Sequence, residues 1–169
     1  MKQNDNIFVL ALKLFVICLV IALGLSALNY VTEPVIAQLT ETAKKEAMEA
    51  VLPDCDLEKA NENVYIGTKD GKTVGYAVNV VTQEGYGGAI EMIIGFDEAF
   101  GITGMEYISM SETPGLGTRA KDESFTSQFL GQQAKAFEEI DALTGATVTS
   151  KAVNGAINQA SEMAKEAAK

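Results

Sequence analysis

The sequence predicts an α+β fold, in which an antiparallel sheet with packed helices follows one N-terminal transmembrane helix. Three observations support this expectation. An apolar run covers residues 7–31, short β-rich segments separated by turn residues fill 64–108, and the last 20 or so residues show a helical apolar stripe. Successive β-rich segments with no helix between them favour an antiparallel sheet. We expect three parts: an anchor helix over 1–32, a helical stalk over 33–53 and a folded domain over 54–169.

The apolar run is long enough to cross a membrane. Residues 14–32 contain no charged side chain, and about 20 apolar residues cross a hydrocarbon core of ~30 Å. A cleaved signal peptide is the alternative, but its apolar core is usually ~7–15 residues long and ends in a small-residue cleavage site. This run is longer and lacks such a site. We therefore expect an uncleaved, single-pass anchor in the lipid of the cell membrane.

The charges around the apolar run predict its orientation. Lys2 and Lys13 precede or enter the run, whereas Glu33 and Glu41 follow it. Positive charges favour the cytoplasmic side of a membrane. We expect a cytoplasmic N-terminus and an extracytoplasmic domain, although the lysines at 44–45 make the charge bias small.

Composition excludes several classes of function. The formal net charge is −10, with 23 acidic and 13 basic residues, so a nucleic-acid partner is not expected. The chain has no histidine, and its two cysteines are Cys18 in the apolar run and Cys55. These residues offer no disulfide, haem, zinc or iron–sulfur site, and no metal is expected. A redox cofactor would therefore be organic.

A helical pattern is expected on each side of the predicted sheet. Glu33-Pro34 begins the first pattern, because proline suits a first helical turn, and the pattern ends before Pro53. We expect this helix to pack on the domain as a stalk. The C-terminal apolar stripe predicts the second helix, with Thr149 or Ser150 as its N-cap.

Short β-rich segments between these helices predict the strands. They cover Val64–Ile66, Val74–Thr82, Ile90–Phe96 and Ile102–Ile108. Asp70-Gly71-Lys72 is typical of a hairpin turn, and the glycines of 85–88 interrupt the β pattern. A further short helix is expected over Ser124–Leu130, before Gly131.

The segment Asp141-Ala142-Leu143-Thr144-Gly145-Ala146-Thr147 lies directly before the C-terminal helix. Helix N-termini bind phosphate because their free N–H groups and the helix dipole both favour negative charge. Gly145 and Ala146 leave little bulk around the Thr147 hydroxyl, and Lys151 adds a positive charge one turn later. An ordinary turn before a capped helix is the alternative. We interpret Thr147 as the residue that carries a phosphate-linked cofactor.

Two glycine-containing loops are candidates for the rest of a binding site. In residues 111–118, a Pro-Gly pair and a second glycine at 117 allow close approach to a ligand, while Glu112 and Thr113 supply polar groups. In Gly85-Tyr86-Gly87-Gly88, the tyrosine is able to stack on a flat ring. Ordinary turns are the alternative for both loops.

The three segments together resemble the covalent FMN-binding domain. The resemblance is carried by Gly85-Tyr86-Gly87-Gly88, Glu112-Thr113-Pro114-Gly115-Leu116-Gly117 and Asp141-x-x-Thr144-Gly145-Ala146-Thr147-x-Thr149-Ser150. That domain occurs in the G subunit of the Rnf complex and in the C subunit of the sodium-pumping NADH:quinone reductase. The resemblance covers roughly residues 60–160. Ser111 stands where some relatives have histidine, and Thr144 where many have serine.

The resemblance implies that a flavin transferase joins FMN through its phosphate to Thr147. It implies no catalytic residue in this chain. The expected cofactor-binding residues are Thr147, Thr144, Gly145, Ala146 and Lys151 around the attachment point, Glu112, Thr113, Leu116 and Gly117 as the wall of the ring or ribityl chain, and Tyr86, Gly87 and Gly88. A tether keeps FMN where free cofactor is scarce, and acidic surroundings lower its reduction potential.

The function implied is that of an electron-carrying subunit of an ion-translocating membrane oxidoreductase. The resemblance to the Rnf G subunit implies electron relay between ferredoxin and NAD, with the other subunits of the complex as partners and no substrate site in this chain. The quinone-reductase C subunit is an alternative, which the short soluble part disfavours. A membrane-anchored binding or assembly module without flavin is another. A hydrolase is disfavoured because no carboxylate pair lies in an apolar pattern.

Overall fold

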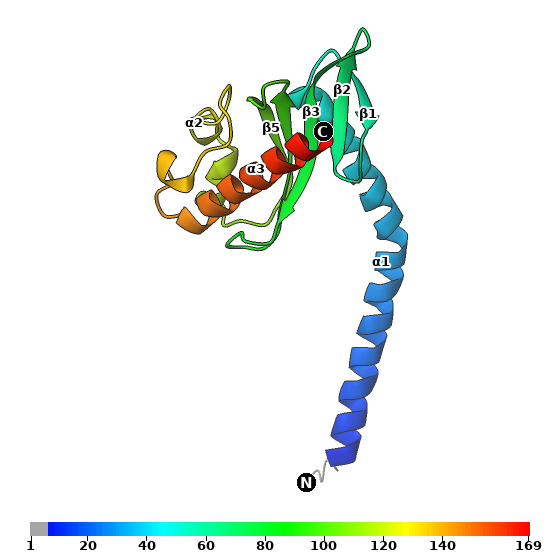
Figure 1. The fold of residues 1–169 in the computed structure, drawn as a ribbon. Coiled ribbons are helices and arrows are strands. Elements are labelled where there is room, and N and C mark those ends of the chain that lie inside the picture. Colours follow the sequence, from blue (N-terminus) through cyan, green and yellow to red (C-terminus); the bar gives the residue numbers. More distant parts are fainter. Residues whose placement is uncertain (1–6) are drawn as a thin grey trace. The chain divides into compact units, whose positions relative to one another are not determined.

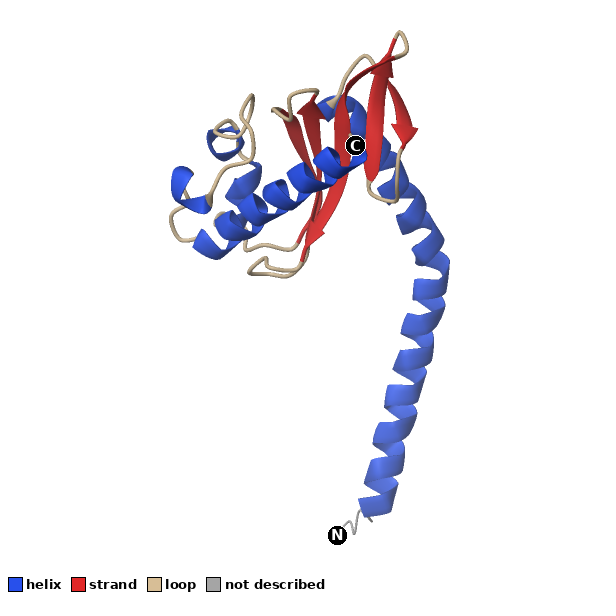
Figure 2. Ribbon diagram, in the orientation of Figure 1, coloured by secondary structure: helices blue, strands red, loops and turns tan. Residues whose placement is uncertain are grey.

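The computed structural model describes residues 7–169. Lys2, on which the orientation prediction partly depends, lies outside the described residues, as does the beginning of the predicted anchor. The chain forms two compact units, residues 1–41 and residues 42–169. The described part of the first unit is helical, and the second holds the sheet and all the remaining described helices (Figures 1 and 2).

Helix α1 runs from Ile7 to Val51 without interruption. The predicted separate stalk helix beginning at Glu33-Pro34 is therefore wrong, because Pro34 lies inside α1. An internal proline removes one backbone hydrogen bond, whereas ending the helix would leave up to four N–H and four C=O groups without intrahelical partners. Between Gly24 and Pro53 the sequence has no other glycine or proline, so continuing the helix through Pro34 is the lesser cost.

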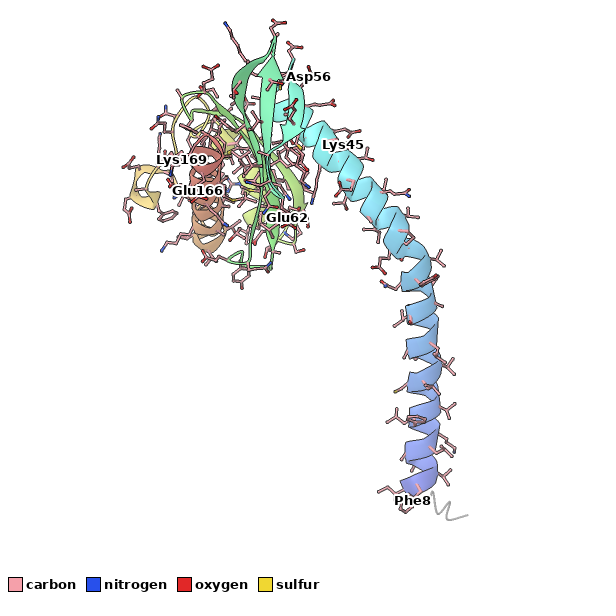
Figure 3. All side chains as sticks on the ribbon, turned by 45° about the vertical axis from the view of Figure 1, so that its right-hand side comes forward. Phe8, Lys45, Asp56, Glu62, Glu166 and Lys169 are labelled. Carbon is pink, nitrogen blue, oxygen red and sulfur yellow. The ribbon has the colours of Figure 1, made fainter. Side chains whose placement is uncertain are left out.

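The N-terminal part of α1 is long and apolar enough to cross a membrane. Its most apolar 18-residue window has a mean hydropathy of 2.9, and none of that window is buried. Figure 3 shows side chains leaving this part of the helix on all sides, beginning at Phe8. A helix that is apolar all round and buried by no other element requires an apolar surrounding.

The second unit contains a five-stranded antiparallel sheet in the order β1-β2-β3-β4-β5. Its strands are β1 (Asp56–Lys59), β2 (Val64–Lys69), β3 (Lys72–Thr82), β4 (Ile90–Asp97) and β5 (Ile102–Met110). The antiparallel arrangement and the four predicted strands are confirmed. The prediction missed β1, because Asp-Leu-Glu-Lys is short and charged, which suits an edge strand but does not resemble a core strand. The 70–71 turn is confirmed, with positive φ at both residues.

Helices cover both faces of the sheet. On one face, helix α3 (Thr147–Ala167) buries Val153 and Ile157 against residues such as Val78, Met92 and Ile94. Figure 1 shows α3 lying across the strands. On the other face, Ala47, Met48, Val51 and Leu52 pack on Ala77 and Ile93. The end of α1 therefore belongs to the folded unit.

Glycines let α1 lie close to the sheet. A Cβ at Gly95 would come within 2.5 Å of the Val51 carbonyl oxygen, and one at Gly104 within 3.1 Å of the Val51 Cα. The Thr103 hydroxyl donates a hydrogen bond of 2.6 Å to the same Val51 carbonyl oxygen. The last turn of α1 is thus fixed to β4 and β5 through backbone contacts that a side chain would prevent.

The connection from β5 to α3 contains short helices. They are the 3-10 helix η1 (Gly117–Lys121), the helix α2 (Glu123–Thr126) and the 3-10 helix η2 (Phe137–Glu139). The helix predicted over Ser124–Leu130 is shorter than expected. The Phe129 N–H bonds to the Thr126 carbonyl, which tightens the chain into a turn, and the buried ring of Phe129 then packs edge-on against Phe125.

Candidate functional site

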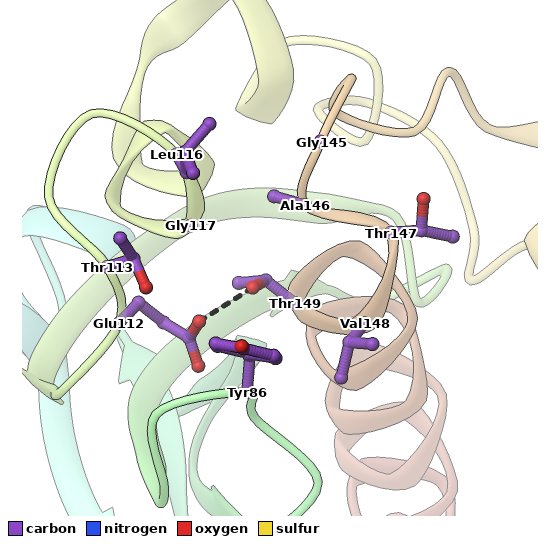
Figure 4. Close-up of a pocket in the computed structure, with 10 residues that line it drawn as sticks. All are labelled: Tyr86, Glu112, Thr113, Leu116, Gly117, Gly145, Ala146, Thr147, Val148 and Thr149. Atoms are coloured by element: carbon purple, nitrogen blue, oxygen red, sulfur yellow. Dashed lines mark hydrogen bonds between the residues drawn. The ribbon is translucent and has the colours of Figure 1, made fainter.

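A cavity of about 480 Å³ lies between three segments that are far apart in the sequence. These segments are the loop between β3 and β4, the loop between β5 and η1, and the beginning of α3. Its lining residues, drawn in Figure 4, are Tyr86, Glu112, Thr113, Leu116, Gly117, Gly145, Ala146, Thr147, Val148 and Thr149. The fold thus brings the three predicted motif segments to one place.

Glu112 holds these three segments together. Its Oε1 accepts a hydrogen bond of 3.1 Å from the Gly87 N–H, and its Oε2 accepts one of 2.7 Å from the Thr149 hydroxyl. The residue is only 6% exposed. Figure 4 shows the Glu112–Thr149 bond at the centre of the lining residues, with Tyr86 next to it. Both carboxylate oxygens are therefore used by donors of the protein itself.

Glycine is required in the two loops because other parts of the chain lie too close there for a Cβ atom. A Cβ at Gly117 would lie 2.5 Å from Glu112 Oε2 and 2.8 Å from the Thr149 hydroxyl oxygen. A Cβ at Gly87 would collide with the Ser111 carbonyl oxygen. These contacts explain the loop glycines by packing of the protein on itself, in addition to any approach of a ligand.

The loop that follows β5 is also attached to the sheet at its C-terminal side, through η1. The Tyr107 hydroxyl donates a hydrogen bond of 2.9 Å to the carbonyl oxygen of Ala120, in η1. Burial raises the pKa of the Tyr107 hydroxyl well above its usual range, so this group stays a donor at all physiological pH values. The contact fixes η1, and with it Leu116 and Gly117, relative to β5.

Helix α3 begins at Thr147, with Ala146 in the N-cap position and no side chain capping it. The predicted cap at Thr149 or Ser150 is wrong, because both residues lie within the first turn and are buried. Gly145, with φ of +80°, makes the turn that places the helix start here. A helix that begins without a side-chain cap leaves first-turn N–H groups free to bind an anion.

Thr147 is exposed, and within residues 7–169 no hydrogen bond of its side chain is recorded. Its side chain points away from the Glu112–Thr149 bond in Figure 4. A hydroxyl in this position is free to react and lies beside the free amides of α3. Ala146, in contrast, is buried and forms part of the cavity wall.

Two side chains hold the loop before Thr147 in place. The Gln128 side chain accepts a hydrogen bond of 2.8 Å from the Asp141 N–H and donates one of 3.3 Å to the Asp141 carbonyl. The Ser150 hydroxyl accepts one of 2.9 Å from the Leu143 N–H and donates one of 3.0 Å to the Ala146 carbonyl. The loop is thus fixed at both ends before the exposed threonine.

Four of the residues predicted for the site do not line the cavity. They are Thr144, Gly87, Gly88 and Lys151. Gly87 contributes through its N–H bond to Glu112, whereas Thr144 is exposed on the loop. The Lys151 ammonium lies 5.2 Å from the centre of the Phe137 ring, which is a cation–π contact outside the cavity. A role for Lys151 toward a phosphate stays a prediction.

The sequence-based prediction missed Val148 and Gln128 and misplaced Thr149. Val148 and Thr149 line the cavity because they occupy the first turn of α3 on the side that faces Glu112. The available signal for Thr149 was its place in the motif that ends at Thr149-Ser150. Gln128 has no such signal, since only the tertiary fold brings it to Asp141.

Comparison with known proteins agrees with this geometry. A family described as the FMN-binding domain matches residues 85–162. The chain is 33% identical over 173 residues to the G subunit of the proton-translocating ferredoxin:NAD(+) oxidoreductase complex of Clostridium ljungdahlii, covering 95% of this chain and 93% of that protein. This chain belongs to the family of G subunits of ion-translocating oxidoreductase complexes.

Other members of the family are similar over most of their length. The G subunit of the Na(+)-translocating ferredoxin:NAD(+) oxidoreductase complex of Acetobacterium woodii is 34% identical, covering 90% of this chain and 88% of that protein. The G subunit of the ion-translocating oxidoreductase complex of Escherichia coli K12 is 27% identical, covering 80% of each chain. The resemblance predicted from the three motifs is confirmed, and the apolar part of α1 fits a membrane-anchored member of this family.

The residues present fit FMN. The cavity volume lies within the ~300–1,000 Å³ usual for sites of small ligands. The helix start offers free amides for a phosphate, and Tyr86, Leu116 and Val148 offer exposed apolar surface for a flat ring.

Proposed function

We propose that this protein is the electron-carrying subunit of an Rnf-type ferredoxin:NAD+ oxidoreductase and carries FMN bound covalently to Thr147. The observation that carries the proposal is the exposed Thr147 hydroxyl at the uncapped start of α3, on the edge of a cavity of about 480 Å³. The match to the FMN-binding domain family, which includes this turn, supports it.

The attachment would esterify the hydroxyl oxygen of Thr147 with the flavin phosphate. The new bond joins this oxygen to phosphorus, the hydroxyl proton is lost, and the phosphorus releases its former leaving group. Joining FMN itself would require the loss of water, so the donor has to be a flavin nucleotide activated by a phosphoanhydride. We expect a separate flavin transferase to catalyse the step, since Glu112, the carboxylate among the described lining residues, is hydrogen-bonded to Gly87 and Thr149.

Each part of the cavity would have a distinct task. The first-turn amides of α3 would bind the phosphate, which is worth about 0.3–1 kcal/mol at an exposed helix end. Tyr86, Leu116 and Val148 would contact the ring, and Glu112, Thr113 and Gly117 would form the wall behind it. The bound FMN supplies the redox chemistry of its ring, while the protein holds and orients it.

The names of two relatives support a place for this chain in such a complex. Two proteins similar to this chain over most of both lengths are named as G subunits of ferredoxin:NAD(+) oxidoreductase complexes. We infer that this chain passes electrons between other subunits of such a complex and binds neither ferredoxin nor NAD as a substrate. These names favour this assignment over the quinone-reductase C subunit.

The anchor and its orientation complete the proposal. We infer that residues 1–32 anchor the protein in the cell membrane as a single pass, with a cytoplasmic N-terminus and an extracytoplasmic flavin domain. The apolar, unburied helix supports the anchor. A covalent tether suits a compartment from which a dissociated cofactor would be lost.

The test is flavinylation of the full-length protein co-produced with a flavin transferase. The wild type is expected to give a band that fluoresces under ultraviolet light on a denaturing gel, and a mass increase of FMN less one water. Thr147→Val keeps the side-chain shape without the hydroxyl and should give no band, whereas Thr147→Ser should keep it. A dark wild type would support a binding or assembly module, and a fluorescent Thr147→Val protein would exclude this attachment site.

A further inference from the structure

Among the described residues that line the cavity, Glu112 is the one charged side chain, and it forms no recorded salt bridge. Glu112 is 6% exposed and lines the cavity. The salt bridges recorded within residues 7–169 are Lys44–Glu91 and Lys165–Glu162, so Glu112 takes part in none. Buried carboxylates are usually paired with a cation or hydrogen-bonded by several donors.

The two hydrogen bonds recorded for Glu112 come from neutral donors. Both oxygens act as acceptors, one from the Gly87 N–H at 3.1 Å and one from the Thr149 hydroxyl at 2.7 Å. The charge at this position is therefore stabilised by neutral donors and is not cancelled by a counter-charge.

The surrounding backbone allows little movement of the Glu112 carboxylate. Because residue 117 is glycine, Glu112 Oε2 is able to lie against the backbone there. Residue 85 is also glycine, and a Cβ at that position would come within 2.6 Å of Glu112 Oε1. The Gly87 bond holds the loop that carries Tyr86, and the Thr149 bond holds the first turn of α3. A negative charge is thus fixed at the wall of the cavity.

We propose that Glu112 has two roles, which rest on the proposed FMN site. It positions the Tyr86 loop against the start of α3, and it sets a fixed negative charge beside the flavin that lowers the reduction potential of this carrier. A flavin gains negative charge on reduction unless protons follow, so a nearby uncancelled anion disfavours the reduced form. The effect is strengthened by burial, because charges interact more strongly where water is excluded.

The test compares three full-length, flavinylated variants with the wild type by potentiometric titration at pH 8. Glu112→Gln removes the charge while keeping size and one acceptor, and it should raise the potential. Thr149→Val removes a donor but keeps the charge, which is then less neutralised, so the potential should fall. Glu112→Asp keeps the charge, so its potential should stay close to that of the wild type even if its thermal midpoint falls.

The outcomes separate this proposal from its alternatives. An unchanged or lower potential in Glu112→Gln would overturn it. A higher reduction potential in both Glu112→Gln and Thr149→Val would also overturn it. Such a result would indicate that both substitutions act by opening the cavity to water, and not through the charge of Glu112. If Glu112→Gln fails to fold, Thr149→Val decides the proposal: a lower potential supports it, and an unchanged or higher potential overturns it. A wild type without flavin refutes the proposed function instead, and that result is seen before any potential is measured.

Discussion

Glycine at position 117 shows how one missing side chain determines the geometry of the cavity. The space where its Cβ would lie is occupied by Glu112 Oε2 and the Thr149 hydroxyl. The two groups form the shortest hydrogen bond recorded in the cavity, at 2.7 Å. At the residue scale, the close contacts of this site therefore serve the protein's own polar network.

Gly117→Ala is expected to destabilise the folded protein by roughly 1–3 kcal/mol, because the new methyl group separates a buried donor from its acceptor. The control is Gly155→Ala in the exposed part of α3, where a Cβ meets nothing closer than 3.9 Å. That change should stabilise the protein by about 0.5–1 kcal/mol through helix propensity. Thermal or urea unfolding measures both, and equal effects would contradict the explanation.

The Cys55 thiol should react slowly with alkylating reagents. Burial and the charge of Asp56 raise the pKa of this thiol above its ordinary value, so less thiolate is present at pH 8 than in a free cysteine. In a Cys18→Ala background, the alkylation rate should still increase above pH 9. Asp56→Asn should accelerate alkylation at pH 8, and an unchanged rate would show that the carboxylate has no influence.

At the scale of elements, the loop before α3 depends on the helix that follows it. Ser150 is fully buried in α3, and its hydroxyl bonds to Leu143 and Ala146 of the loop. The sequence suggested that this serine caps the helix. It instead stabilises the turn that exposes Thr147, from within the first turn of the helix.

Ser150→Ala is expected to cost about 1–3 kcal/mol, because the Leu143 N–H loses its buried acceptor. Faster hydrogen exchange at Leu143 and slower flavinylation of Thr147 should accompany the loss. Ser161→Ala is the matched control in the same helix, since the buried Ser161 hydroxyl has no partner among the described residues. It should be neutral or stabilising. Equal destabilisation by both changes would refute a specific role for Ser150.

At the scale of the whole molecule, the last turns of α1 complete the folded domain. Met48 and Val51 cover one face of the sheet, where Ala77 and Ile93 are fully buried. The boundary expected from the sequence, at residue 54, would remove these contacts. The compact unit begins at Thr42 instead.

A fragment of residues 42–169 should therefore fold without the membrane anchor, and one of residues 54–169 should be much less stable. Exposing the apolar face costs about 25 cal/mol per Å² of newly exposed apolar surface. Urea unfolding of both fragments measures the difference. A similar midpoint for the two would show that the end of α1 adds nothing to the domain.

The elements with strong local patterns were predictable. The apolar run, the β-rich segments of β3 to β5, the 70–71 turn and the amphipathic α3 follow from hydrophobic periodicity and turn chemistry, which act between neighbouring residues. The edge strand β1 and the continuity of α1 through Pro34 were missed, because pairing with β2 and the cost of ending a helix outweigh local preference.

The sequence by itself determined that an acidic α+β domain follows an apolar helix, and which three segments resemble an FMN-binding domain, since composition and motif are properties of the chain. Only the tertiary structure decided that Glu112 joins those segments, that Gln128 and Ser150 hold the loop before Thr147, and that Lys151 contacts Phe137. The physical reason is that hydrogen bonds and burial depend on distances in space. Partners such as Glu112 and Thr149, which lie 37 positions apart in the sequence, come within hydrogen-bond distance only on folding.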